Sequence, residues 1–154
     1  MSPAPAWRVL CLGNDLLADD GFGPAVAQTL RNTPVEVVVA TAAGWALLDY
    51  LSGVPNLLVV DTIATGRAAP GTVLLLEEED LLRASGASPH GLGLLETLAL
   101  ARALRLPVPG KIVWIAVEAA DCSTVGGAMH PAVRAAVPAV AERIRKITAI
   151  CDGG

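Results

Sequence analysis

The apolar residues of this chain gather in short runs bounded by glycine, proline or aspartate, with segments of helical periodicity between them. Three such runs are WRVLCLG at 7–13, VEVVVA at 35–40 and NLLVVD at 56–61. Runs of this kind are typical of strands buried on both faces of a parallel sheet. Hydrophobic residues make up 53% of the 154 residues and aromatic residues only 3%, so aliphatic side chains fill the core. The sequence predicts one α/β domain over 1–154.

The helical segments alternate with these strands. Gly23 and Pro24 open the segment PAVAQTLRN, where proline suits the first turn of a helix. Apolar residues recur at helical spacing in later segments as well. Helices are predicted at 24–32, 45–53, 91–104 and 131–150, with a further strand at 111–118 and a kink in the last helix at Pro138.

The connection after Asp61 departs from this alternation. Only the nine residues TIATGRAAP separate it from the apolar run GTVLLLEE at 71–78. A parallel connection generally needs a dozen or more residues, because it must cross over the sheet. The 71–78 run is therefore predicted to be an antiparallel strand in an otherwise parallel, five-stranded sheet. The acidic EEED at 77–80 is interpreted as the solvated end of that strand.

Charge and cysteine content exclude several classes of protein. The formal net charge is −4 and the sequence has no dense stripe of lysine or arginine, so nucleic acid is not a predicted partner. No apolar stretch approaches the ~20 residues that span a bilayer, and residues 1–6 lack the features of a secretory signal. The three cysteines have no CxxC spacing and are interpreted as reduced thiols. We expect a cytoplasmic protein without a membrane partner.

The turn CLGNDLLADDGFG at 11–23, between the first predicted strand and helix, is acidic. A glycine-bearing turn at this place could hold a dinucleotide, but only two of the three glycines of GxGxxG are present. Asp19 and Asp20 stand just before these glycines and would repel phosphate. The sequence also lacks the Gly-Lys-Ser/Thr of a P-loop. The turn therefore favours a cation over a nucleotide.

Three residues that could bind a metal fall at one edge of the predicted sheet. The carboxyl ends of parallel strands share an edge, and ligands bind in the crevice there. Asp20 follows the first strand, Asp61 ends the 56–61 strand, and His90 precedes the helix that leads into the 111–118 strand. Two carboxylates and one imidazole with an open position suit a first-row metal. The alternative is structural, because aspartate is also common at helix N-termini and in turns.

Three motifs occur here in the same order as in a known family. The first, GN-x-L-x-x-D-[D/E]-G-x-G, is met by residues 13–23. The second, a strand ending in aspartate with Pro-Gly shortly after, is met by Asp61, Pro70 and Gly71, and the third, Ser-x-His before an amphipathic helix, by residues 88–90. From residue 8 to about residue 145 the chain thus resembles the hydrogenase maturation proteases, which remove a C-terminal extension from the large subunit of nickel–iron hydrogenases.

The resemblance implies a fold, an activity and a partner. The family fold is a three-layer αβα sandwich with one antiparallel strand. The implied activity is that of a nickel-dependent, aspartyl-type endopeptidase, and the implied partner is the hydrogenase large-subunit precursor, which supplies the nickel. Family residues at the positions of Asp20, Asp61 and His90 bind the metal, so these three are the expected catalytic and metal-binding residues. The alternative is a non-catalytic chaperone that checks the nickel of the precursor without cutting it.

Four polar residues near the last predicted strand have no assigned role, and these are Glu118, Asp121, Cys122 and His130. A cysteine nucleophile needs a base within reach, and no papain-like or caspase-like signature surrounds Cys122, so it is interpreted as a structural thiol. His130 stands before Pro131 and is interpreted as a helix-start residue. After the 35–40 strand the chain keeps Gly44 of the family pattern but lacks the threonine that often follows it, at a position that usually faces the substrate.

Overall fold

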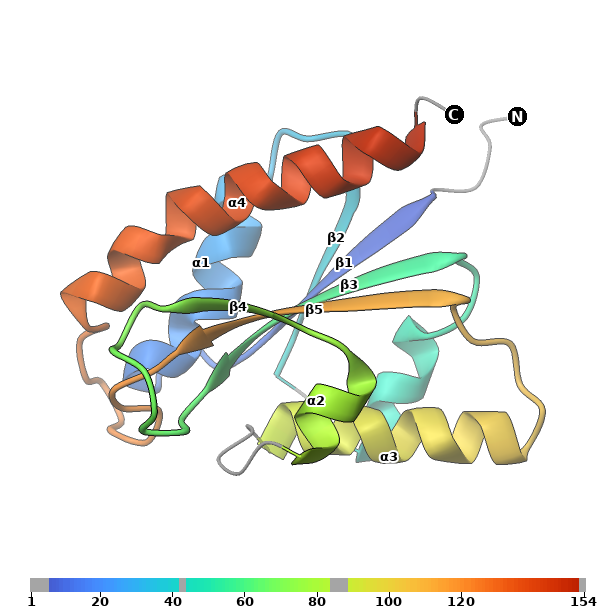
Figure 1. Cartoon of the computed structure of the whole chain (residues 1–154), viewed down its shortest axis with the longest axis horizontal. Coiled ribbons are helices and arrows are strands. Elements are labelled where there is room, and N and C mark those ends of the chain that lie inside the picture. The colour runs from blue at the N-terminus through green and yellow to red at the C-terminus, as the bar shows by residue number, and fades with distance from the viewer. Residues whose placement is uncertain (1–5, 42–43, 84–88, 153–154) are drawn as a thin grey trace.

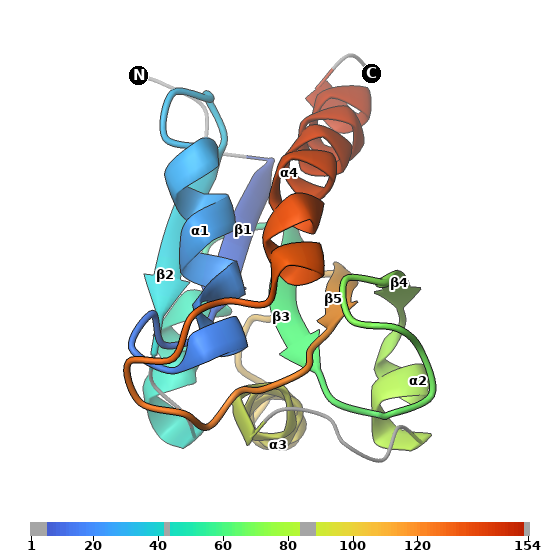
Figure 2. The same ribbon diagram turned by 90° about the vertical axis from the view of Figure 1, so that its left-hand side faces the viewer.

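The protein is built on one five-stranded sheet, seen in a computed structural model that describes residues 6–41, 44–83 and 89–152. Its elements in chain order are β1 (Trp7–Leu12), the 3₁₀ helix η1 (Ala18–Gly21), α1 (Phe22–Thr29), β2 (Glu36–Ala40), the 3₁₀ helix η2 (Gly44–Tyr50), β3 (Asn56–Ile63), β4 (Val73–Leu76), α2 (Glu78–Arg83), α3 (Pro89–Ala103), β5 (Lys111–Glu118) and α4 (Pro131–Asp152). The strand order is β2-β1-β3-β5-β4. Helices α1 and α4 cover one face, and η2 and α3 cover the other (Figures 1 and 2). The predicted three-layer αβα fold is confirmed.

Four strands run parallel and end at the same edge of the sheet. β1 pairs with β2 on one side and with β3 on the other, and β3 pairs with β5. The registers place Leu12 beside Ala40, Cys11 beside Val60, and Ile63 beside Glu118. The segments that leave this carboxyl edge therefore lie close together, although they are far apart in the sequence.

β4 is antiparallel to β5, as the short connection after β3 predicts. The strand is shorter than the predicted 71–78, because Gly71 adopts a φ of +90° and Thr72 donates its N–H to the Ala69 carbonyl at 3.1 Å in a turn. At the other end, Asp80 Oδ2 accepts the Glu77 N–H at 2.8 Å. This bond begins α2, so the interpretation of EEED as a solvated strand end is wrong.

Two hydrophobic cores flank the sheet, because successive strand residues point to opposite faces. Beneath α1 and α4, the strand side chains that pack include Val9, Cys11, Leu58, Val60, Ile115 and Val117. Beneath η2 and α3, they include Leu10, Leu12, Leu57, Val59 and Trp114. Each continuous apolar run therefore supplies side chains to both hydrophobic cores.

The predicted helices are present with shifted bounds, and the one predicted at 45–53 is the 3₁₀ helix η2. α1 begins at Phe22, two residues before the predicted start, because η1 leads directly into it. α4 begins at Pro131 and continues through Pro138. His130 Nδ1 accepts the Ala132 N–H at 3.1 Å, so the prediction of a helix-start histidine is confirmed.

Among the described residues, the helices are either too short or too polar to cross a membrane.

Candidate active site

Asp20 lies in the segment that joins β1 to α1 at the carboxyl edge of the sheet. Gly13 turns the chain away from β1 with a φ of +145°, and a Cβ there would lie 2.1 Å from the backbone oxygen of Asp20. Only glycine fits such a position. Asp20 is 5% exposed, and its Oδ2 accepts the Asn14 N–H at 2.9 Å. The segment therefore folds a buried carboxylate against the end of β1.

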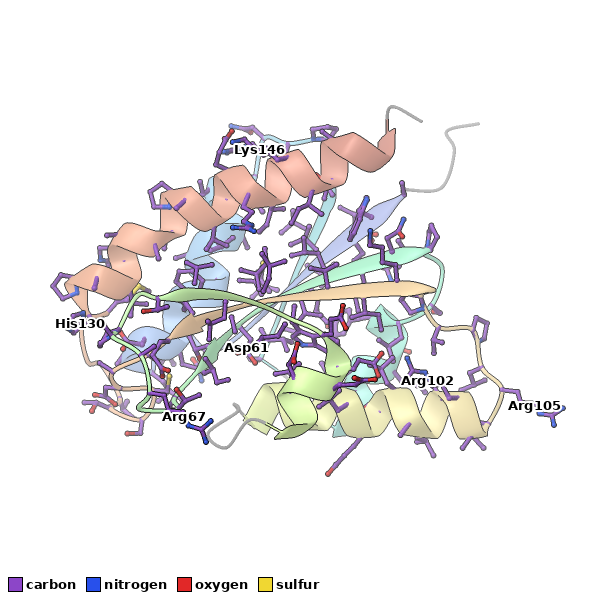
Figure 3. The ribbon with its side chains drawn as sticks, in the orientation of Figure 1. Asp61, Arg67, Arg102, Arg105, His130 and Lys146 are labelled. Atoms are coloured by element: carbon purple, nitrogen blue, oxygen red, sulfur yellow. The ribbon has the colours of Figure 1, made fainter. Side chains whose placement is uncertain are left out.

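Asp61 lies in the neighbouring strand, β3. This strand continues to Ile63, so Asp61 is not its last residue, as the sequence analysis expects, but the third from its end. Leu57 and Val59 belong to the core beneath α3, and Asp61 follows them at the two-residue period of a strand, so it points to the α3 face. Asp61 is 4% exposed, and its Oδ1 accepts the Thr62 N–H at 2.8 Å. Figure 3 shows it toward the end of the molecule that carries His130, away from Arg105.

His90 is the second residue of α3, and its side chain lies outside the described residues. The first turn of α3 lies on the side of the molecule to which β3 and β5 point (Figure 1). Among the side chains that are described, no group of three histidine, cysteine or acidic residues could hold a metal ion. Asp20, in η1 after β1, and Asp61, in the adjacent strand β3, both lie toward the carboxyl edge of the sheet, and the metal site of Asp20, Asp61 and His90 stays a prediction.

The Cys122 thiol lies among these carboxylates. Its Sγ donates to Thr62 Oγ1 at 3.5 Å. Burial raises the pKa of the thiol, the Thr62 hydrogen bond opposes this, and the charges of Asp20, Asp19 and Asp61 raise it further, to about 11. The bond to Thr62 places the Cys122 thiol beside the strand residue that follows Asp61.

The first aspartate of η1, Asp19, has a structural role that the sequence analysis missed. It is 1% exposed, and its Oδ2 accepts the N–H groups of Ala120 at 2.7 Å and Asp121 at 2.9 Å. Its Oδ1 accepts the His130 N–H at 2.7 Å, and its own N–H donates to the Asp121 carbonyl at 2.8 Å. These four bonds tie η1 to the segment 119–130. No local pattern reveals them, since the partners are 101 to 111 residues away.

Glu118 has a similar role for the segment between β3 and β4. It ends β5, is 1% exposed, and accepts both the N–H of Thr65, at 2.8 Å, and the Thr65 hydroxyl. Its backbone N–H donates to the Thr72 carbonyl, and its carbonyl accepts the Gly71 N–H, each at 2.8 Å. Two buried carboxylates thus fix the two loops that flank the candidate site.

Comparison with known proteins identifies the family of this chain. The family described as hydrogenase maturation protease matches residues 25–147. The chain belongs to the hydrogenase maturation protease family. The hydrogenase expression/formation protein HoxM of Cupriavidus necator is 31% identical over 140 residues, which are 86% of this chain and 68% of that protein.

Two further relatives are named as a protease and an endopeptidase. The hydrogenase 2 maturation protease of Escherichia coli is 33% identical over 101 residues, which are 61% of this chain and 62% of that protein. The solved structure of the hydrogenase maturating endopeptidase HybD from Escherichia coli matches with a TM-score of 0.79 at 28% identity, over 96% of this chain and 93% of that one. The names confirm the prediction of a hydrolase of the peptidase class, and the structural likeness confirms the fold.

For a hydrogenase maturation protease with a thiol at its candidate site, the reactivity of Cys122 is a direct test of the structural interpretation. A pKa of about 11, against the ordinary 9.0, leaves roughly 100-fold less thiolate at pH 8. We therefore expect iodoacetamide to alkylate Cys122 of the metal-free folded protein about 100-fold more slowly than in urea, with the rate rising as pH increases toward 11. Peptide mapping by mass spectrometry separates Cys122 from the other cysteines. Equal rates in the folded and unfolded protein at pH 8 would contradict a raised pKa for this thiol, and a faster rate in the folded protein would show that the thiol is activated.

Proposed function

We propose that this chain is an endopeptidase, acting in the cytoplasm, that removes the C-terminal extension of a nickel–iron hydrogenase large-subunit precursor once nickel is present in that precursor. The observation that carries the proposal is the pair of buried carboxylates at the carboxyl edge, Asp20 in η1 after β1 and Asp61 in the adjacent strand β3, in a member of the hydrogenase maturation protease family. Buried carboxylates at such an edge are typical of functional sites.

The donor set fits nickel that the precursor carries. Carboxylate oxygens and an imidazole are ligands for first-row metals, and Asp20, Asp61 and His90 would contact the ion there. The N–H groups of Asn14 and Thr62 each orient one of the two carboxylates. Nickel in the precursor would polarise the scissile carbonyl, activate a water or only position the substrate.

Hydrolysis adds one water across the scissile peptide bond, which yields a new carboxylate on the large subunit and an amine on the released extension. A carboxylate or imidazole beside that bond can accept the proton of the water and return it to the leaving nitrogen. Asp20 and Asp61 are therefore proposed to act on the reacting groups together with His90, and the loops that Asp19 and Glu118 fix hold them in place.

The test is a mass-spectrometric cleavage assay on a hydrogenase large-subunit precursor, with and without nickel. We expect the wild-type protein to release a C-terminal peptide only from the nickel-loaded precursor, and His90→Ala to lower the rate by about 100-fold or more. His130→Ala is the matched control, because His130 is the chain's other histidine and its ring accepts only a helix N–H in the structure.

Each other outcome bears on the proposal. If His130→Ala is as slow as His90→Ala, the assignment of His90 is wrong. If the loaded precursor binds but stays intact, the chain is the alternative, a chaperone that checks nickel. A precursor that is cut equally well without nickel contradicts the nickel requirement.

A further inference from the structure

Asn14 follows the turn at Gly13, in the segment that leads from β1 to η1. Its side-chain Oδ1 accepts the Leu16 N–H at 3.0 Å, and its carbonyl accepts the Leu17 N–H at 3.1 Å. An asparagine side chain that bonds the backbone two residues on mimics a backbone turn. Asn14 therefore closes the turn of residues 14–17 with both its side chain and its carbonyl.

This turn holds Asp20 at two atoms. The Asn14 N–H donates to Asp20 Oδ2 at 2.9 Å, and the Asp20 N–H donates to the Leu17 carbonyl at 2.9 Å. Both bonds close loops that contain the turn, so the position of the carboxylate depends on the geometry of the turn. Asparagine forms the turn without placing a second negative charge beside Asp20, as an aspartate would.

The segment is anchored to the rest of the fold by bonds that do not involve the Asn14 side chain. The Gly13 N–H donates to the Ala40 carbonyl, at the end of β2, at 3.2 Å. The Asp19 carboxylate accepts N–H groups of the segment 119–130. These anchors hold the segment against the sheet, and the Asn14 side chain shapes the turn between them.

The bond between the Asn14 side chain and the Leu16 N–H lies at the surface. Leu16 is exposed, so water can replace Oδ1 as the partner of this N–H. A hydrogen bond that water can replace contributes much less to the free energy of unfolding than one whose loss leaves a buried group unsatisfied. Removing the side chain should therefore leave the protein folded and alter mainly the turn. Even a small displacement of a reacting group lowers a rate strongly.

We propose that Asn14 is a positioning residue for the endopeptidase reaction and that it acts on the Asp20 carboxylate through the turn of residues 14–17. The inference rests on the proposed function, because it concerns the cleavage in which Asp20 is proposed to act. Asn14 does not contact the reacting peptide bond in this proposal. Its effect is therefore on kcat and not on the affinity for the substrate.

The first test compares Asn14→Ala with Asn14→Ser in the cleavage assay on the nickel-loaded precursor. We expect Asn14→Ala to lower kcat about tenfold, while KM and the urea midpoint stay near those of the wild type. Asn14→Ser should stay within about threefold of the wild-type kcat, because a serine hydroxyl makes the same turn bond more weakly.

Asn56→Ala is the matched control for removing an asparagine side chain with one hydrogen bond. Asn56 Nδ2 donates to the Ala6 carbonyl at 2.8 Å, and Asn56 begins β3, so it lies at the opposite end of this strand from the carboxyl edge. We expect the folded Asn56→Ala protein to cleave the precursor at the wild-type rate.

The second test measures the turn itself, without precursor or nickel. Amide hydrogen exchange followed by NMR reports how often each N–H loses its hydrogen bond. We expect the protection of the N–H groups of residue 14 and Asp20 to fall about fivefold in Asn14→Ala, since both bonds depend on the turn. Protection within β1 and β3 should not change.

Several results would overturn the proposal. One is a wild-type kcat for Asn14→Ala, and another is a raised KM with an unchanged kcat, which would place Asn14 on the substrate. A urea midpoint that falls with kcat would make the role merely structural, and a slow Asn14→Ser would exclude the turn bond as the cause. If the wild type does not cut the loaded precursor, the proposed function fails, but the protection values still decide whether Asn14 positions Asp20.

Discussion

Replacing Asp19 by asparagine is expected to lower the free energy of unfolding by about 3 kcal/mol or more. The Asp19 carboxylate accepts three backbone N–H groups, two on Oδ2 and one on Oδ1. An asparagine keeps one acceptor oxygen and turns an NH₂ toward at least one of these donors, which leaves a buried N–H without a partner. Urea unfolding followed by circular dichroism measures the loss as a lower midpoint.

The control for this prediction is Glu142→Gln. Glu142 forms an exposed ion pair with Arg145, whose guanidinium lies 3.5 Å away one helical turn on. Exposed pairs of this kind contribute about 0.5 kcal/mol or less, so the control should unfold near the wild-type midpoint. A midpoint for Asp19→Asn that equals that of the control would mean that the segment 119–130 does not depend on the carboxylate.

The sheet could be predicted from the sequence because its determinants are local. The apolar runs around Val9 and Val59 are buried on both faces, and β-branched residues dominate the half-buried run around Val38, so each short segment is best explained as a strand. The antiparallel direction of β4 follows from the length of its connection, which is too short to cross the sheet. These arguments need no knowledge of which residues meet across the fold.

Two elements, η1 and α2, were not predicted from the sequence. η1 forms because Asp19 binds the segment after β5, and no sequence pattern near Asp19 shows a partner more than 100 positions away. α2 forms because Asp80 caps Glu77, a local signal that the acidic run obscured, since four successive carboxylates suggest solvent rather than a helix start. The three-residue spacing of Glu77 and Asp80 is the local signal for the start of α2.

The candidate site was predicted in part by topology. Asp20 and Asp61 follow from the rule that parallel strands end at one edge, and the structure has Asp20 in η1 after β1 and Asp61 in the adjacent strand β3. The anchoring roles of Asp19 and Glu118 could not be predicted, because their acidic side chains give the same sequence signal as a ligand or a solvated turn. Burial distinguishes them, since both are 1% exposed and bonded to backbone N–H groups.

The second large effect is expected at Gly23, in the first turn of α1. A Cβ at this position would lie 2.3 Å from the Leu12 carbonyl oxygen and 3.0 Å from the Leu12 carbonyl carbon. Both atoms belong to the backbone of β1, which is held on its two sides by β2 and β3, so they cannot move aside as a flexible side chain could. We expect Gly23→Ala to lower the free energy of unfolding by about 3 kcal/mol, measured by the urea midpoint.

Gly110→Ala separates this clash from the general effect of adding a methyl group to a glycine. At Gly110 the nearest atom to an added Cβ is the Pro55 oxygen, at 4.0 Å, so the substitution should change stability by less than about 1 kcal/mol. Gly23 also lies three residues after Asp20, and a helix displaced from β1 would carry η1 with it. The cleavage rate of Gly23→Ala should therefore fall even at temperatures where the variant is folded. Wild-type cleavage by a destabilised Gly23→Ala protein would show that α1 can shift on β1 without moving Asp20.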